Sequence, residues 1–406
     1  MRYLVLSLFL IPVLINCSSN PTYTVKEFSS PTGENASLPR LFTDNTGTVF
    51  MSWVESDGDS TSLLYSSLTN NEWTKSELIS KSDSWFVNWA DFPSIIARNG
   101  EPIAVHWLQK IPGGTYAYNV NITNASSDWE HVIAPHNDNT PTEHGFVSMA
   151  PASDSTFVTI WLDGRNTVNS GGHDDHDTPS GIASAMTLRA AVIDADLNVL
   201  ESYLIDESVC DCCGTTVVNT ESGFITAYRN RTENEIRDIY ISRFVNGQWE
   251  NSKPVFDDNW NIAACPVNGP SIDADGNSIA VAWFTGANDE SKVKVAFSED
   301  EGQTFSQPIV LDNGNPLGRV DVEFLEDGTA LVSWMERNME DRSKAFFNGK
   351  KVSKKGQVLN EFKISLMESS RRSGFPQISS YNKSIIAAWT DLSTPSTPKV
   401  KVAILE

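Results

Sequence analysis

The chain has 406 residues, of which 40% are hydrophobic and 10% aromatic, including 12 tryptophans. This aromatic content excludes a disordered protein, and the length allows one large domain or two ordinary ones. The net charge of −22 would repel a phosphate backbone, so we expect no nucleic-acid partner.

The N-terminus has the features of an export signal. Arg2 gives a short positive start, Tyr3–Ile15 is apolar, and Cys17 follows at once. The apolar run is too short to span a bilayer in a mature protein. It resembles a bacterial lipobox, in which the cysteine is lipidated. We therefore expect a signal peptide over residues 1–17, lipidation at Cys17 and a periplasmic or cell-surface protein that contacts the membrane only through its lipid; an ordinary cleaved signal peptide is the alternative.

Seven segments further along the chain share one pattern, an alternating apolar run that ends in an aromatic residue. The aromatic recurs every 51 to 67 residues. Strand-like repeats at this period are typical of a β-propeller. The seven aromatics are Trp53, Trp107, Trp161, Tyr228, Trp283, Trp334 and Trp389.

Each repeat contains four strand-like runs, and no convincing amphipathic helix occurs. The sequence thus predicts an all-β fold, one propeller over residues 18–406, with seven blades, six being the alternative. The last repeat ends after three strands, near residue 404. We expect Tyr23–Phe28 to supply the fourth and close the ring, because closure removes a free sheet edge. The expected oligomeric state is a monomer.

The segment Ser298–Phe305 (SEDEGQTF) fits the Asp-box pattern S-x-D-x-G-x-T-F. Its Asp and Gly suit a tight turn between the third and fourth strands of a blade. With this box, the chain resembles the sialidase-like propellers, also called Asp-box or BNR-repeat proteins. The resemblance implies a hydrolase of the exo-sialidase type that acts on acidic glycans and needs no cofactor. True sialidases have six blades, and Ser37–Arg40 (SLPR) matches their first arginine motif only loosely.

Arginine recurs in the loops that a propeller gathers on one face. A guanidinium fork matches a carboxylate, so these loops predict a site for an acidic glycan or another anionic small molecule. The alternative is that the arginines form ion pairs between blades. The candidate substrate-binding residues are Arg165, Arg229, Arg231, Glu336 and Arg372.

The resemblance also implies catalytic roles. Arg40, Arg237 and Arg319 would bind the substrate carboxylate, and Asp91 would be the general acid. No tyrosine stands out as the nucleophile. Tyr228 fills a position that is tryptophan in the other repeats, so we expect it to be a packing residue.

Four cysteines fall in two places only, the segment VCDCCG with Cys210, Cys212 and Cys213, and Cys265. In an exported protein, disulfides between blades four and five are the first expectation. Thiolates at this spacing can also bind Cu(I) or Zn(II), and a redox-active site is a third alternative.

Blade three carries the longest insertion, residues 166–180, with His173 and His176 among carboxylates. Imidazoles at this spacing can bind zinc or copper, and His144 could join them; a solvated acidic loop is the alternative. Three functions are thus expected from the sequence: glycan hydrolysis or binding, metal binding by the cysteine and histidine loops, and a disulfide-stapled scaffold for protein interaction.

Overall fold

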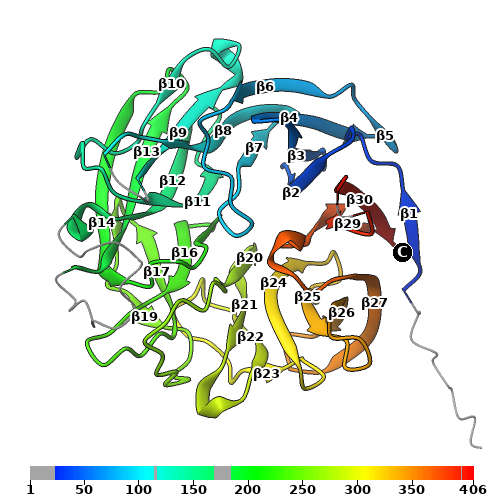
Figure 1. The fold of residues 1–406 in the computed structure, drawn as a ribbon. Coiled ribbons are helices and arrows are strands. Elements are labelled where there is room, and N and C mark those ends of the chain that lie inside the picture. Colours follow the sequence, from blue (N-terminus) through cyan, green and yellow to red (C-terminus); the bar gives the residue numbers. More distant parts are fainter. Residues whose placement is uncertain (1–22, 114–116, 169–183, 395) are drawn as a thin grey trace, which may run out of the picture.

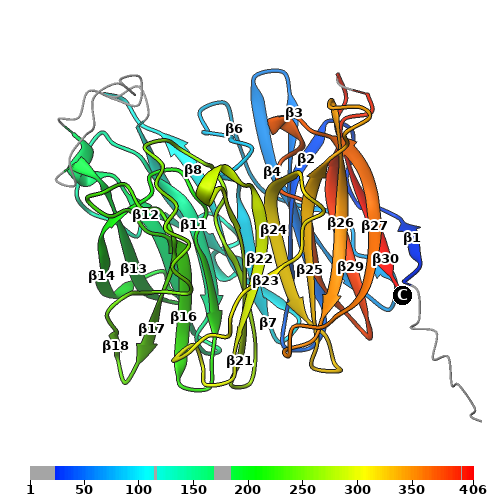
Figure 2. The same ribbon diagram turned by 90° about the horizontal axis from the view of Figure 1, so that it is seen from below.

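The computed structural model describes residues 23–113, 117–168, 184–394 and 396–406. Over these residues the protein is a ring of seven antiparallel sheets, as predicted (Figures 1 and 2). In this part of the chain, no helix reaches the length and apolar character that a membrane crossing requires.

Each blade is a meander that runs from the axis outward. The innermost strands are β2 (Ala36–Thr43), β7 (Ser94–Arg98), β11 (His144–Pro151), β15 (Thr216–Asn219), β20 (Ser271–Asp275), β24 (Pro316–Phe324) and β28 (Gln377–Tyr381). The second strands are β3 (Val49–Asp57), β8 (Glu101–Lys110), β12 (Thr156–Asp163), β16 (Gly223–Arg229), β21 (Ser278–Thr285), β25 (Ala330–Arg337) and β29 (Ser384–Asp391). The third strands are β4 (Ser60–Thr69), β9 (Tyr118–Asn124), β13 (Met186–Asp194), β17 (Ile239–Val245), β22 (Lys292–Ser298), β26 (Lys344–Val352) and β30 (Lys399–Leu405).

The outer strands vary in length from 2 to 11 residues. They are β5 (Glu72–Trp73), β6 (Glu77–Ser82), β10 (Val132–Ile133), β14 (Val199–Val209), β18 (Gln248–Trp249), β19 (Lys253–Pro254), β23 (Ile309–Val310) and β27 (Val358–Glu368). The described helices are single 3-10 turns: η1 (Ala125–Ser127), η2 (Arg165–Thr167), η4 (Ala287–Asp289) and η5 (Arg371–Ser373). Trp129 precedes β10 and packs edge-on against Tyr65.

The N-terminal strand closes the ring as predicted. β1 (Val25–Phe28) pairs antiparallel with β30, with Val25 opposite Leu405 and Phe28 opposite Val402 (Figure 1). The last blade therefore contains both ends of the described chain. This pairing covers the free edge that β30 would otherwise expose.

The repeated aromatic is the packing centre of each blade, and all seven are buried. In three blades the indole Nε1 donates to the carboxylate two residues later, from Trp53 to Glu55, from Trp161 to Asp163 and from Trp334 to Glu336. Tyr228 in blade four is also fully buried and donates to Asp206 Oδ2 at 2.5 Å. This confirms Tyr228 as a packing residue.

The innermost strands have no partner strand on the channel side, so side chains of other blades accept their free N–H groups. Asp273 accepts from Phe324 N, Asp321 from Ile378 N and Glu323 from Ser380 N. These carboxylates join blades five, six and seven around the axis.

Three innermost strands share a bulge at which a residue other than glycine has a positive φ: Leu38 (55°), Phe146 (53°) and Arg319 (55°). Such conformations are uncommon and need support. A side chain from another blade accepts the N–H of each: Thr390 Oγ1 for Leu38, Asp91 Oδ2 for Phe146 and Asn268 Oδ1 for Arg319.

The predicted turn at residues 298–305 lies between β22 and β23. Asp300 accepts from the Thr304 N–H and hydroxyl, and Ser298 Oγ accepts from Gly302 N. Phe305 packs on the core cluster between blades four and five. This segment has a structural role in the described fold.

Candidate functional site

Three buried sulfur atoms meet where β14 ends. Cys210 follows Val209 directly, and its N–H donates to the Arg229 carbonyl oxygen at the end of β16. Cys210 Sγ lies 4.0 Å from Cys212 Sγ and 3.6 Å from Cys213 Sγ, and all three sulfurs lie within 4.8 Å of one another. All three side chains are buried. We call Cys210, Cys212 and Cys213 the sulfur triad.

The four described cysteines are free thiols in the structure. A disulfide bond is about 2.05 Å long, roughly half the separations in the triad. The disulfide staples that we expected between blades four and five are therefore not found in this arrangement. A metal ion about 2.3 Å from each thiolate would instead hold the sulfurs about 3.8–4.0 Å apart, which fits the observed distances.

Two guanidinium groups give the triad a positive environment. Arg237 Nη1 donates to Cys210 Sγ at 3.3 Å. Hydrogen bonds from Cys212 and Cys213, together with the charges of Arg237 and Arg229, hold the pKa of Cys210 well below its usual range. Burial raises the pKa of Cys212 and of Cys213. The chain thus favours a thiolate at Cys210, the form that binds metals.

Arg229 is 2% exposed, and its guanidinium donates to main-chain carbonyl oxygens. The acceptors are the oxygens of Asn268, Arg237 and Phe284, and the Trp260 ring lies 4.9 Å away. Burying a charge is costly unless a counter-charge compensates it. A thiolate at Cys210, whose pKa the charge of Arg229 helps to lower, would supply such a counter-charge.

An outer ring of ion pairs orients these groups. Arg237 and Arg231 both bind Glu235 at 2.7 Å, and Arg231 Nη1 lies 3.1 Å from Asp211 Oδ2. Asp211 Oδ1 accepts from Met186 N. Burial raises the pKa of Asp211, and Cys210 adds to this effect. These ion pairs hold Asp211, in the turn between Cys210 and Cys212, and they orient the guanidinium of Arg237.

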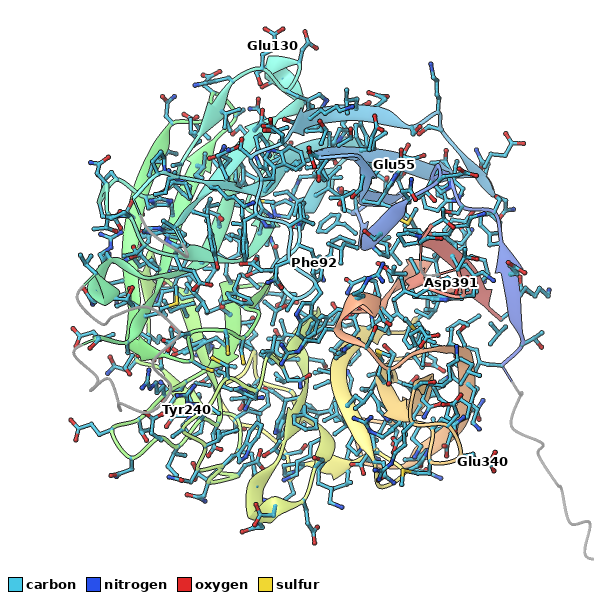
Figure 3. The ribbon with its side chains drawn as sticks, in the orientation of Figure 1. Glu55, Phe92, Glu130, Tyr240, Glu340 and Asp391 are labelled. Atoms are coloured by element: carbon cyan, nitrogen blue, oxygen red, sulfur yellow. The ribbon has the colours of Figure 1, made fainter. Side chains whose placement is uncertain are left out.

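The triad is embedded in an apolar core cluster between blades three and four. Its core cluster includes Ala90, Phe146 and Tyr228, and Trp89, Cys265 and Phe375 pack against it. Trp89 stacks on Phe375 with ring centroids 5.8 Å apart, and Phe92, near the middle of the ring in Figure 3, lies 6.1 Å from Phe375. Aromatic side chains from distant blades therefore keep water away from the sulfurs.

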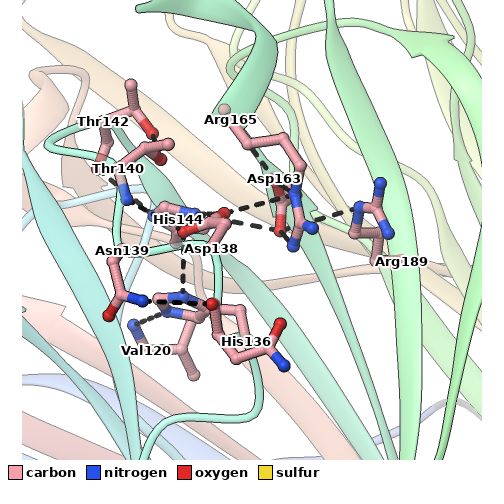
Figure 4. Close-up of polar contacts among 12 residues, drawn as sticks. Val120, His136, Asp138, Asn139, Thr140, Thr142, His144, Asp163, Arg165 and Arg189 are labelled. Carbon is pink, nitrogen blue, oxygen red and sulfur yellow. Dashed lines mark hydrogen bonds and ion pairs between the residues drawn. The ribbon is translucent and has the colours of Figure 1, made fainter.

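A second polar cluster lies in blade three, at the start of β11 (Figure 4). His144 Nε2 lies 2.8 Å from Asp138 Oδ2, and His144 Nδ1 lies 3.3 Å from the Thr142 carbonyl oxygen. Both partners are hydrogen-bond acceptors, so they suit a ring N–H of His144. Burial opposes the ionisation of Asp138, but the hydrogen bond from His144 and the charge of Arg165 lower its pKa overall.

The ligand atoms of His136, Asp138 and His144 lie within 4.8 Å of one another. The two imidazole rings, however, are stacked with centroids 3.9 Å apart and planes 3° from parallel. A metal ion lies in the plane of each imidazole that binds it, and two stacked planes share no such point. The observed geometry therefore fits an ion network, not a metal centre bridging both histidines.

The predicted substrate-binding residues mostly have partners within the chain. Arg165 binds Asp163 through two hydrogen bonds of 2.6 and 2.8 Å, and Arg231 binds Asp211 and Glu235. Glu336 accepts from Trp334 Nε1 and from the N–H groups of Asn313 and Asn315. For these residues the structure favours the alternative of internal ion pairs and hydrogen bonds.

The predicted catalytic arginines have three separate environments. Arg40 Nη1 donates to Gln377 Oε1, Arg237 binds Glu235 and Cys210, and Arg319 Nη1 donates to the Gly374 carbonyl oxygen. The guanidinium carbon of Arg319 also lies 5.0 Å from the centroid of the Trp89 ring. The guanidinium carbon of the exposed Arg371 lies 5.7 Å from the same centroid. Arg319 and Arg237 thus border the aromatic and sulfur cluster, whereas Arg40 lies beside the carboxylates between blades six and seven.

Asp91 is 3% exposed and holds the bulge at Phe146. Burial, together with the nearby Glu143, raises its pKa to about 8. Asn268 supports the equivalent bulge at Arg319 with an uncharged amide. The chain therefore contains a natural precedent for asparagine in this role.

Replacing Asp91 with asparagine is expected to remove a pH-dependent loss of stability. A carboxyl group whose pKa is raised on folding stabilises most below its unfolded pKa of about 3.9, and this contribution is lost as the pH rises through the folded value. From about pH 5 to about pH 8, the unfolding free energy of the wild type should fall relative to Asp91→Asn by roughly 1–3 kcal/mol. Urea unfolding at both pH values measures this; parallel pH profiles would contradict the buried, raised-pKa assignment.

Three residues singled out in the sequence, Cys17, His173 and His176, lie outside the described residues. Sequence reasoning missed His136 and Asp138, which join His144. The spacing His-x-Asp before the start of a blade was the available signal. It also missed that Arg237 donates a hydrogen bond to Cys210 and that the charges of Arg229 and Arg237 lower the pKa of this cysteine. Nothing in the local sequence links Arg237 to Cys210, which lies 27 positions earlier.

Fold and site together define a seven-bladed β-propeller with a buried sulfur triad in the core between blades three and four. No protein-family model matches the chain, and no curated protein matches it. Solved structures resemble it only in fold. A prolyl endopeptidase shares 10% identity at a TM-score of 0.47, with 91% of this chain and 46% of that chain covered.

Two further solved structures are sialidase-like by name. The neuraminidase-like protein from A/bat/Guatemala/164/2009 shares 10% identity at a TM-score of 0.47, with 94% and 93% of the chains covered. Trypanosoma rangeli sialidase, in complex with the inhibitor DANA, shares 9% identity at 0.43, with 91% and 55% covered. The chain spans about half the length of this sialidase and of the prolyl endopeptidase.

Proposed function

We propose that the protein binds a soft metal ion, Cu(I), through the thiolates of Cys210, Cys212 and Cys213. The observation that carries this proposal is the geometry of the sulfur triad: three buried sulfurs in mutual contact, with a guanidinium nitrogen 3.3 Å from Cys210 Sγ. Thiolates select Cu(I) and zinc among biological metals.

The number of close sulfurs favours Cu(I) over Zn(II). Structural zinc sites are almost always four-coordinate, whereas only three sulfurs form the mutually close group, and Cys265 is not one of them. Arg237 would hold Cys210 as a thiolate, and Arg229 would offset the negative charge that three thiolates leave on the site. The apolar shell of Phe146 and Trp89 would exclude water and oxidants. We further propose that the protein does this after export, anchored through Cys17.

Metal titration of the reduced protein under anaerobic conditions tests the proposal. We expect one Cu(I) per chain, with an ultraviolet thiolate-to-metal charge-transfer band, and weaker binding of Zn(II). Tighter binding of zinc, or the absence of any metal binding by the reduced protein, would contradict it.

A second candidate function is binding of acidic glycans. The observation in its favour is Arg371, which is exposed and lies over Trp89 on the axial aromatic group. A guanidinium beside an aromatic face suits a carboxylated sugar. A sialoside array and a fluorogenic sialoside test it with wild type and Arg371→Ala; equal signals from both proteins, or none from the wild type, would rule out this surface.

A further inference from the structure

Cys265 differs from the three buried cysteines in exposure and position. It is partly exposed, while Cys210 and Cys213 are each 1% exposed. Its side chain packs against the core cluster that contains the triad, and its thiol interacts with Cys212. It lies outside the mutually close triad. Cys265 is therefore positioned between the triad and solvent.

The backbone that follows Cys265 is packed against the turn that carries the triad. Asn268 is the anchor: its carbonyl oxygen accepts from Arg229, and its Nδ2 donates to the carbonyl oxygens of Pro266 and Leu317. A Cβ atom on Gly269 would lie 2.1 Å from the Gly214 carbonyl oxygen, so only glycine allows this approach to the turn after Cys213. The two cysteine-bearing turns are thus packed backbone to backbone.

Val267, which directly precedes Asn268, has a φ of 50°. A β-branched residue in this region is a genuine outlier and costs energy that the surrounding structure must offset. Such strain clusters at binding and switching sites. Here it fixes the direction in which the Cys265-Pro266-Val267 segment leaves the axial cluster.

We infer that Cys265 is the exchange ligand of the metal site, which takes Cu(I) from a small-thiol complex at the surface and passes it to Cys212. This inference rests on the proposed function. In the first step the Cys265 thiol gives its proton to solvent, a copper–sulfur bond to Cys265 forms, and the bond to the donor thiolate breaks. The donor thiolate leaves and takes up a proton. In the second step a copper–sulfur bond to Cys212 forms while the bond to Cys265 breaks, and the proton of the Cys212 thiol passes to the departing Cys265 sulfur. Copper remains Cu(I) throughout, so no oxidant or reductant is needed.

The test compares four full-length proteins, all carrying Cys17→Ser so that the internal cysteines are the only thiols: the parent, Cys265→Ser, Cys213→Ser and Ala264→Ser. Ala264→Ser is the matched control, an exposed neighbour in the same loop. Competition with a chromophoric Cu(I) chelator gives the affinity and stoichiometry. Stopped-flow mixing with the Cu(I)–glutathione complex gives the transfer rate.

We expect Cys265→Ser to keep one Cu(I) per chain and an affinity within about 3-fold of the parent, but to acquire copper about 10-fold or more slowly. Ala264→Ser should match the parent in both measurements, and Cys213→Ser should lose affinity. Unchanged transfer in Cys265→Ser overturns the inference. Loss of stoichiometric binding in Cys265→Ser also overturns it, because Cys265 would then be a permanent ligand. If the parent binds no Cu(I), the proposed function itself fails, and this result is distinct from the other two.

Discussion

Replacing Cys210 with serine is expected to lower the affinity for Cu(I) by at least about 100-fold. Cys210 is the sulfur that contacts both other members of the triad and also accepts the hydrogen bond of Arg237. A serine hydroxyl stays protonated at neutral pH and is a hard ligand, so the site would lose a soft anionic donor. Anaerobic competition with a chromophoric Cu(I) chelator measures the change.

The control for this experiment checks that the variant still folds. Serine is close in size to cysteine, so Cys210→Ser should keep the near-ultraviolet circular dichroism of the folded protein. Arg237→Gln is the companion variant, which keeps all sulfurs but removes the charge, and we expect a loss of about 10-fold. If Cys210→Ser binds Cu(I) as tightly as the wild type, the triad is not the metal site.

Replacing Trp334 with alanine is expected to cost about 3–5 kcal/mol of the unfolding free energy. Trp334 is fully buried, packs in the core cluster between blades five and six, and donates to Glu336 Oε2 at 2.6 Å. The truncation removes that packing and leaves a cavity. It also removes one donor to a buried carboxylate. Urea unfolding followed by circular dichroism measures the cost.

Two variants separate packing from the hydrogen bond. Trp334→Phe retains most of the ring but not the donor and should cost less than Trp334→Ala. Trp73→Ala alters a partly exposed tryptophan of the outer strand β5, which packs at the edge of a core cluster and donates to the Ser29 carbonyl oxygen, and it should cost less than Trp334→Ala. Equal losses for Trp334→Ala and Trp73→Ala would contradict the assignment of the repeated aromatic as the packing centre of each blade.

The periodic part of the fold was predictable from the sequence. Alternation of apolar and polar residues marks strands, and the repeated aromatic, from Trp53 to Trp389, marks the blades, because every blade must bury the same kind of strand against its neighbour. The spare strand over residues 23–28 was predictable because the last repeat lacked its fourth strand.

The candidate site was predictable only in part. The spacing of Cys210, Cys212 and Cys213 marked a cluster, and the repeat placed Cys265 at the start of the next blade. Whether the sulfurs bond to each other or stand about 4 Å apart depends on side-chain directions, which spacing does not specify. The same limit applies to Arg237, whose guanidinium lies beside Cys210 and not in a shared arginine pocket.

By itself, the sequence determined the architecture of this protein: seven blades, their aromatic centres and the strand that closes the ring. Each of these follows from the alternation of apolar and polar residues and from the aromatic residue that recurs in every repeat. Only the tertiary structure decided which polar residues meet. It placed Asp91 on a backbone N–H, Arg229 on main-chain carbonyl oxygens and Arg237 on a sulfur. Such contacts join residues of different strands and blades at distances of about 3 Å, and hydrogen bonds at this range depend on exact approach and not on order along the chain.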